Sequence, residues 1–136
     1  MLLADTSAWH HSGHKVVIDE WSRLLDADQI ATTPPVRLEV LFSARSAADY
    51  TALYEELDAL HQVPCGEPAF ERAMQVQRAL AEQHALHHRS VKIPDLLIAA
   101  AAELAGVTIW HYDEDYERIA AITGQPIRWV ARRGTL

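Results

Sequence analysis

Cysteine is nearly absent from this sequence, which has one, Cys65, among 136 residues. A single cysteine excludes an internal disulfide framework and supplies too few ligands for a structural zinc site. We interpret Cys65 as a small buried hydrophobe. The chain also lacks any apolar run near the roughly 20 residues of a membrane helix, and Met1 leads into LLAD without a basic region or an apolar signal core. We therefore expect a cytoplasmic protein with no membrane segment.

Positive charge is scarce as well. Twelve Lys and Arg residues face 19 Asp and Glu residues, which gives a formal net charge of −7. This balance argues against binding nucleic acid through bulk positive charge, so a nucleic-acid role would need a metal and local basic residues. Two local pairs exist, Arg89 with Lys92 and Arg132 with Arg133, and each also fits an ordinary solvated surface.

Hydrophobic residues are abundant, at 49% of the chain, which is enough to build one domain over residues 1–136. Short apolar runs alternate with segments of helical periodicity, a pattern typical of a parallel α/β sheet. The predicted strands are residues 2–4, 30–32, 62–64, 107–110 and 127–130. The predicted helices are residues 17–27, 34–44, 48–60, 67–86, 94–105 and 116–122.

The stretch from Ser90 to Ile122 is the most informative part of the sequence. Its pattern predicts a helix, a strand, an acidic turn and a second helix. Pro94 favours a helix start, which puts Asp95 in the first turn, and Gly106 favours the helix end. The following strand ends at Asp113, Glu114 and Asp115. Carboxylates at a helix start and at a strand end can meet in one crevice, where open α/β sheets bind their ligands.

Four acids from four separate segments are the candidate site: Asp5, Glu39, Asp95 and Asp113. An oxygen-only cluster suits Mg²⁺ or Mn²⁺, which take carboxylates and retain waters that a substrate phosphate can displace. Taken singly, each acid also fits a surface carboxylate or a helix cap. For Glu39 the periodicity alone favours that simpler interpretation, and Asp95 would also suit a helix dipole.

Four motifs carry a resemblance to a known family. They are Asp5 in LLADTSAW, Glu39 in PPVRLEVLFSA, Asp95 in IPDLLIAAAAELAGV and Asp113 in HYDEDYERIA. In this order, across the whole chain, they resemble the PIN-domain ribonucleases, and most closely the VapC-type toxins of bacterial toxin–antitoxin pairs. The resemblance implies a PIN-like three-layer α/β/α fold with a short central parallel sheet.

The same resemblance implies a metal-dependent endoribonuclease whose product carries a 5′-phosphate. Asp5, Asp95 and Asp113 would hold Mg²⁺ or Mn²⁺ directly or through water, and Glu39 would complete the acidic pocket. Ser7 looks like the hydroxyl that holds a carboxylate or a water. Asp115 has two open roles, as a further metal ligand or as the N-cap of the following helix.

The implied partners are RNA, a VapB-like antitoxin and a second copy of the chain in a homodimer. An antitoxin Arg or Lys would enter the acidic pocket, and an apolar stripe that includes Tyr50, Leu53 and Tyr54 would receive its hydrophobic residues. Arg89, Lys92 and His10 are the candidate RNA contacts. The sequence departs from the common family pattern at Pro94, where a polar residue is frequent, and at His111, where threonine is frequent.

Other classes fit less well. The histidine clusters around His11 and around His87 lack an HExxH motif or cysteine partners, so exposed histidines are favoured over zinc. A Toprim-like enzyme needs Glu at the position of Asp5, and a haloacid-dehalogenase-like phosphatase needs Asp at the position of Ser7. A receiver domain needs a lysine at a late strand end. A non-catalytic PIN-like binding module for RNA or protein stays open, with the four intact acids against it.

Overall fold

The computed structural model describes all residues 1–136 and has a five-stranded sheet at its centre. The strand order is β3-β2-β1-β4-β5, and every neighbouring pair is parallel. Leu3 of β1 pairs with Ala31 on one side and Ile109 on the other. The strands are β1 (Leu2–Ala4), β2 (Ile30–Thr32), β3 (His61–Gln62), β4 (Thr108–His111) and β5 (Ile127–Trp129).

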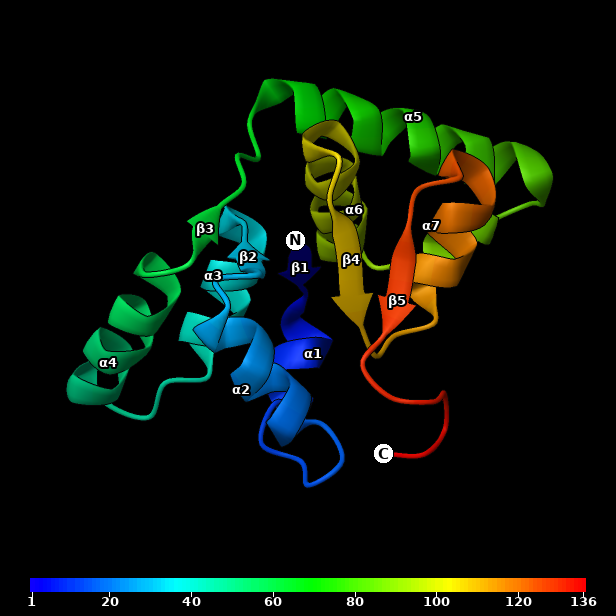
Figure 1. Cartoon of the computed structure of the whole chain (residues 1–136). Helices are drawn as coiled ribbons and strands as arrows, with labels where there is room; N and C mark the ends of the chain where they lie inside the picture. The colour runs from blue at the N-terminus through cyan, green and yellow to red at the C-terminus, as the bar shows by residue number, and fades with distance from the viewer.

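Helices cover both faces of this sheet. In Figure 1, α6 lies behind β4 and α2 lies in front of the sheet, so the strands form the middle of three layers. The predicted α/β/α fold with a short parallel sheet is confirmed. The helices are α1 (Thr6–His11), α2 (Ile18–Asp26), α3 (Pro34–Phe42), α4 (Ala47–Asp58), α5 (Glu67–Gln83), the 3₁₀ turn η1 (His87–Ser90), α6 (Ile93–Ala105) and α7 (Asp115–Thr123).

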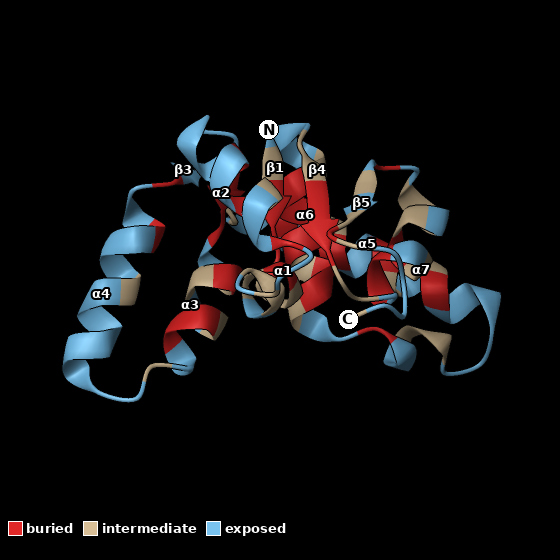
Figure 2. Cartoon of the chain, turned by 60° about the horizontal axis from the view of Figure 1, so that its bottom comes forward, coloured by how far each residue is buried: buried red, intermediate tan, exposed pale blue.

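Helix α6 is the centre of the hydrophobic core. Its residues Ala99–Ala102 are all buried, and their small side chains let neighbouring elements approach closely. Figure 2 shows this helix in the buried middle of the molecule. As predicted, Pro94 lies in its first turn and Gly106 ends it in the left-handed conformation, at φ 69°. This placement sets Asp95 against the ends of the central strands.

Helix α1 was not predicted from the sequence. The Asp5 carboxylate caps it by accepting a hydrogen bond from the Ala8 N–H. Apolar spacing does not reveal α1, because Ala8 is its one fully buried residue. At its end, His10 is exposed and His11 is half-buried. Asp5 therefore follows β1 directly and is the N-cap residue of α1.

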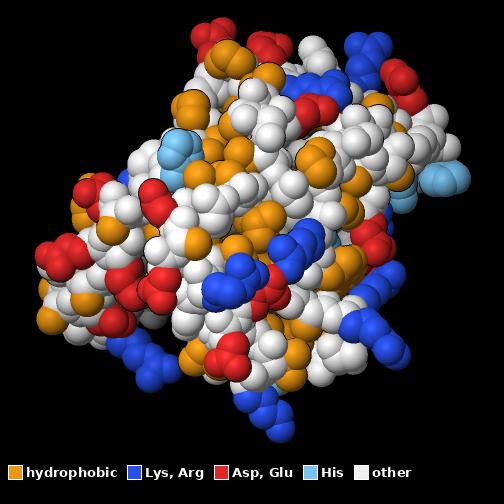
Figure 3. Space-filling model, in the orientation of Figure 1, with side chains coloured by type: hydrophobic (Ala, Val, Ile, Leu, Met, Phe, Trp, Pro, Cys, Tyr) orange, Lys and Arg blue, Asp and Glu red, His pale blue; other side chains and the backbone are white.

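Two helices leave apolar side chains in solvent. On α4, Leu57 is buried, but Tyr50 and Tyr54 are 45% and 46% exposed. On α5, Phe70 and Met74 are 50% and 54% exposed, although helical spacing places them on the same stripe as buried Ala73. The helices pack on other helices at the rim, so only one narrow stripe of each is covered. Figure 3 shows acidic side chains gathered over the region of α4, at the left in the orientation of Figure 1.

None of the helices combines the length and the apolar character that spanning a membrane requires.

Candidate metal centre

Three of the four candidate acids, Asp5, Asp95 and Asp113, lie where β1 and β4 end. The Asp5 N–H donates to the Trp110 carbonyl at 3.1 Å, which joins the end of β1 to the end of β4. Asp113 follows β4 by two residues, and the start of α6 brings Asp95 to the same place. This is the lower edge of the sheet in Figure 1, toward which β4 and β5 point.

Asp5 is held rigidly and is almost fully buried, at 2% exposure. Its Oδ1 accepts from Ser7 Oγ at 2.6 Å and from the Ala8 N–H at 2.9 Å. Ser7 Oγ in turn accepts from the Tyr112 N–H at 2.7 Å. Ser7 thus orients the Asp5 carboxylate and ties it to the turn after β4. Burial raises the pKa of Asp5 to about 6, even though these hydrogen bonds oppose the rise.

Three carboxylates form one cluster. Asp95, Asp113 and Asp115 each place an oxygen so that the three oxygens lie within 4.8 Å of one another. Asp95 is buried, and its Oδ2 has no hydrogen-bond partner. Burial, followed by the neighbouring carboxylates, raises the pKa of Asp95. A buried oxygen without a donor, beside two further carboxylates, fits a hard divalent cation such as Mg²⁺ or Mn²⁺.

The N-cap residue of α7 is Glu114, so the N-cap role considered for Asp115 was wrong. Asp113 Oδ1 accepts from the Asp115 N–H at 2.9 Å, and Asp115 is already the first residue of α7. Asp115 instead accepts from the Lys92 N–H at 3.1 Å and contacts Arg118 at 3.0 Å. The chain enters the helix one residue earlier than the apolar spacing indicated. Asp115 is therefore free to face Asp95 and Asp113.

Glu39 lies on α3 and is not one of the three carboxylates of this cluster. Its Oε1 accepts from Thr6 Oγ1 at 2.7 Å, a contact that the sequence did not indicate. Thr6, His10, Leu38, Glu39, Phe42 and Ser43 line one open pocket. Glu39 is therefore oriented from the start of α1, in a hollow that also contains the predicted RNA contact His10.

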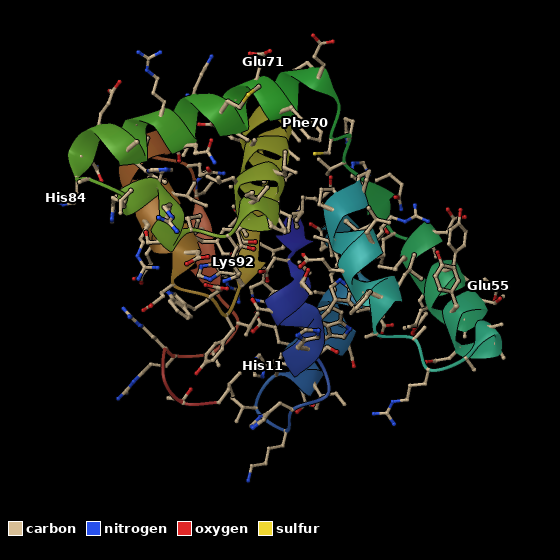
Figure 4. All side chains as sticks on the ribbon, turned by 180° about the vertical axis from the view of Figure 1, so that it is seen from behind. His11, Glu55, Phe70, Glu71, His84 and Lys92 are labelled. Carbon is tan, nitrogen blue, oxygen red and sulfur yellow. The ribbon has the colours of Figure 1, made fainter.

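Lys92 points into the acid cluster. Its Nζ lies 2.8 Å from Asp113 Oδ2, 2.9 Å from Asp115 Oδ2 and 3.4 Å from Asp95 Oδ2. Figure 4 shows Lys92 in the middle of the rear face. Arg89, its neighbour in the sequence, is exposed and forms no ion pair. Of these two predicted RNA contacts, Lys92 is paired with carboxylates and Arg89 extends into solvent.

Two buried residues that were not predicted support the cluster. The Tyr116 hydroxyl donates to Asp95 Oδ1 at 3.2 Å, from a fully buried ring. His111 Nδ1 accepts from the Asp113 N–H at 3.1 Å, and burial lowers the pKa of His111 to about 4. The neutral imidazole thereby positions the turn that carries Asp113. The aromatic residue directly after Asp115 was the available signal for Tyr116; nothing in the spacing singled out the contact of His111.

The histidine clusters form no metal site. His84 and His87 contact each other edge to face, with ring centroids 5.1 Å apart, but they gather no further ligand. Figure 4 shows His84 at one end of α5, far from His11 at the end of α1. The only group of possible metal ligands is the one formed by Asp95, Asp113 and Asp115.

The parallel sheet with carboxylates at its strand ends places the chain among parallel α/β domains with an acidic site, and the PIN domain family matches residues 2–122. The chain belongs to the PIN domain family. It is 60% identical over 132 residues to Ribonuclease VapC18 of Mycobacterium tuberculosis, covering 97% of this chain and 96% of that protein. It is 42% identical over 135 residues to Ribonuclease VapC21 of the same species, covering 98% and 96%.

Solved structures share the fold. The chain resembles the DNA-bound VapBC of Salmonella typhimurium with a TM-score of 0.76 at 17% identity, over 96% of this chain and 98% of that one. It resembles VapBC-1 of nontypeable Haemophilus influenzae with a TM-score of 0.73 at 15% identity, over 95% and 97%. At these identities the likeness concerns the fold, and it extends over nearly the whole chain.

Proposed function

We propose that this chain is a metal-dependent endoribonuclease acting in the cytoplasm as a single domain over residues 1–136. The observation that carries the proposal is the convergence of three carboxylate oxygens within 4.8 Å of one another, at the strand ends and next to buried Asp5. Relatives named ribonucleases, at up to 60% identity, support RNA as the substrate. Oxygen-only ligands favour Mg²⁺ or Mn²⁺ over softer ions.

Asp5, Asp95 and Asp113 are the proposed ligands, joined by Asp115 on the geometry of the cluster. A bound divalent ion would neutralise the phosphate and lower the pKa of a water. Attack of that water on phosphorus, with departure of the 3′ oxygen, leaves a 5′-phosphate on one product and a 3′-hydroxyl on the other. Ser7 holds Asp5, and Thr6 holds Glu39, which faces the open pocket and orients the attacking water or contributes to a second ion. His10 in that pocket and exposed Arg89 are proposed to contact RNA phosphates.

The test is cleavage of total RNA by the purified protein, with Mg²⁺, with Mn²⁺ and with chelator alone. We expect defined cuts in either metal, each giving a new 5′-phosphate end that sequencing can map, and none in chelator. RNA retained on the protein without new ends in any metal would instead favour a non-catalytic PIN-like module. A protein purified in parallel with Asp113→Asn controls for contaminating ribonuclease.

We further propose that the chain acts as the toxin of a toxin–antitoxin pair, neutralised by a VapB-like antitoxin. The resemblance to VapBC complexes supports this assignment, together with the exposed Tyr50 and Tyr54 on α4. The acidic side chains over α4 disfavour RNA there and suit a protein partner that combines basic and apolar residues (Figure 3). An antitoxin Arg or Lys would also pair with the acid cluster.

A homodimer is expected from a second exposed apolar surface, which lies near the start of α6. Phe70 and Met74 of α5, with Ile93 and Leu97 of α6, line one shallow apolar pocket, and Phe42 of α3 is 92% exposed. We expect light scattering to give twice the chain mass at micromolar concentration. Phe70→Glu should shift the protein to monomer, whereas Tyr54→Glu on α4 should leave the dimer intact. A wild-type protein that is monomeric throughout contradicts this assembly.

A further inference from the structure

The ammonium group of Lys92 occupies the position that a metal ion would need. It lies 2.8 to 3.4 Å from one oxygen each of Asp95, Asp113 and Asp115. These are the three residues whose oxygens converge as possible metal ligands. Asp95 Oδ2, which accepts no hydrogen bond, is one of the three oxygens that the ammonium faces.

A divalent ion and this ammonium group are mutually exclusive. Mg²⁺ binds carboxylate oxygens at about 2.1 Å, so an ion bridging these oxygens would overlap the present position of Nζ. Two cations at such short separation would also repel strongly in a partly buried site. Binding of the ion therefore requires the lysine side chain to leave.

The side chain of Lys92 can move away from the three carboxylates while its backbone stays in place. The side chain is 62% exposed, and four rotatable bonds allow it to turn into solvent. The Lys92 N–H stays fixed by its hydrogen bond to Asp115 at 3.1 Å. Displacement thus needs no movement of the segment that positions Asp95, three residues further on.

We infer that Lys92 is an internal, displaceable counter-ion that stabilises the metal-free acid cluster and competes with the divalent ion for Asp95, Asp113 and Asp115. This inference rests on the metal site of the proposed function. It assigns Lys92 a part in setting metal affinity, beyond the RNA contact expected from the sequence. The metal-free chain keeps its acids together through this lysine, and metal binding is correspondingly weaker.

The experiment measures Mn²⁺ affinity by calorimetry, and the melting temperature in chelator, for four proteins: wild type, Lys92→Met, Lys92→Arg and Arg89→Met. Methionine keeps an unbranched side chain, one atom shorter, without the charged group. We expect Lys92→Met to bind Mn²⁺ about ten-fold more tightly and to melt at a lower temperature in chelator. Lys92→Arg keeps the competing charge and should stay near wild type.

Arg89→Met separates direct competition from general electrostatics. It removes one nearby positive charge that contacts no carboxylate, so its Mn²⁺ affinity should change less than two-fold. If Lys92→Met binds Mn²⁺ no more tightly than wild type, the inference is overturned while the metal site stands. Equal gains in Lys92→Met and Arg89→Met overturn it too. If none of the four proteins binds Mn²⁺, the metal-dependent function itself fails.

Discussion

Asp95→Asn should lower kcat/KM for RNA by about a thousand-fold while the protein keeps its fold. Asp95 supplies a buried oxygen that accepts no hydrogen bond, and Asn cannot replace its charge toward a divalent ion. Loss of a ligand that helps to neutralise the transition state costs several kcal/mol, which corresponds to this factor in rate. Asp5→Asn and Asp113→Asn should also abolish measurable cleavage.

The fold should survive Asp95→Asn because the amide matches the carboxylate in size and can still accept from the Tyr116 hydroxyl. Circular dichroism and the melting temperature check this point beside the cleavage assay. Glu114→Gln is the control, since Glu114 is an exposed carboxylate in the turn that carries Asp113, and its contacts are with Arg118 and Arg133. Wild-type cleavage by Asp95→Asn in Mg²⁺ would remove that residue from the metal site.

The second large effect concerns Asp5 and the stability of the metal-free protein. Its pKa rises from 3.8 to about 6 on folding, so the folded state binds this proton more tightly than the unfolded state does. The resulting stability is fully present below about pH 4 and is lost as the pH rises through 6. A shift of about two units amounts to roughly 3 kcal/mol at pH 7.

His111 acts in the opposite direction over the same pH range. Its pKa falls from 6.5 to about 4 on folding, so the unfolded state binds more protons there and stability rises with pH. The pH dependence of the wild-type melting temperature therefore mixes opposed contributions, with Asp95, whose pKa is also raised, acting in the same direction as Asp5. Comparison with Asp5→Asn, which keeps His111 and Asp95 but has no titrating group at position 5, measures the effect of Asp5 together with its charge interaction with Asp95.

We subtract the melting temperature of wild type from that of Asp5→Asn, both in chelator. This difference should increase by roughly 10 °C from pH 4 to pH 7. Thermal melts of both proteins across this range measure the difference. Addition of Mn²⁺ at pH 7 should reverse part of it, because only the wild type keeps the Asp5 carboxylate. A difference in melting temperature that does not change with pH would show that Asp5 has the same pKa in the folded protein as in the unfolded chain.

Much of the fold was available from the sequence because local signals and packing agree. Pro94 and Gly106 predicted the two ends of the helix that became α6, and short apolar runs predicted the strands of a parallel sheet. Helix α1 was missed because it is a single capped turn and a half, too short for periodicity to show. The outward positions of Phe70 and Met74 depend on which neighbours cover α5, and a helical stripe cannot specify that.

The sequence by itself determined that acids follow β1 and β4 and open α6, because strand ends and helix starts are local features. Only the tertiary structure decided which of them share an ion-sized space. Asp115 joins Asp95 and Asp113 because α7 begins one residue earlier than its apolar spacing indicated. Lys92 fills that space because its backbone is fixed by Asp115, 23 residues away in the chain. Such contacts arise from long-range packing, which no spacing along the chain encodes.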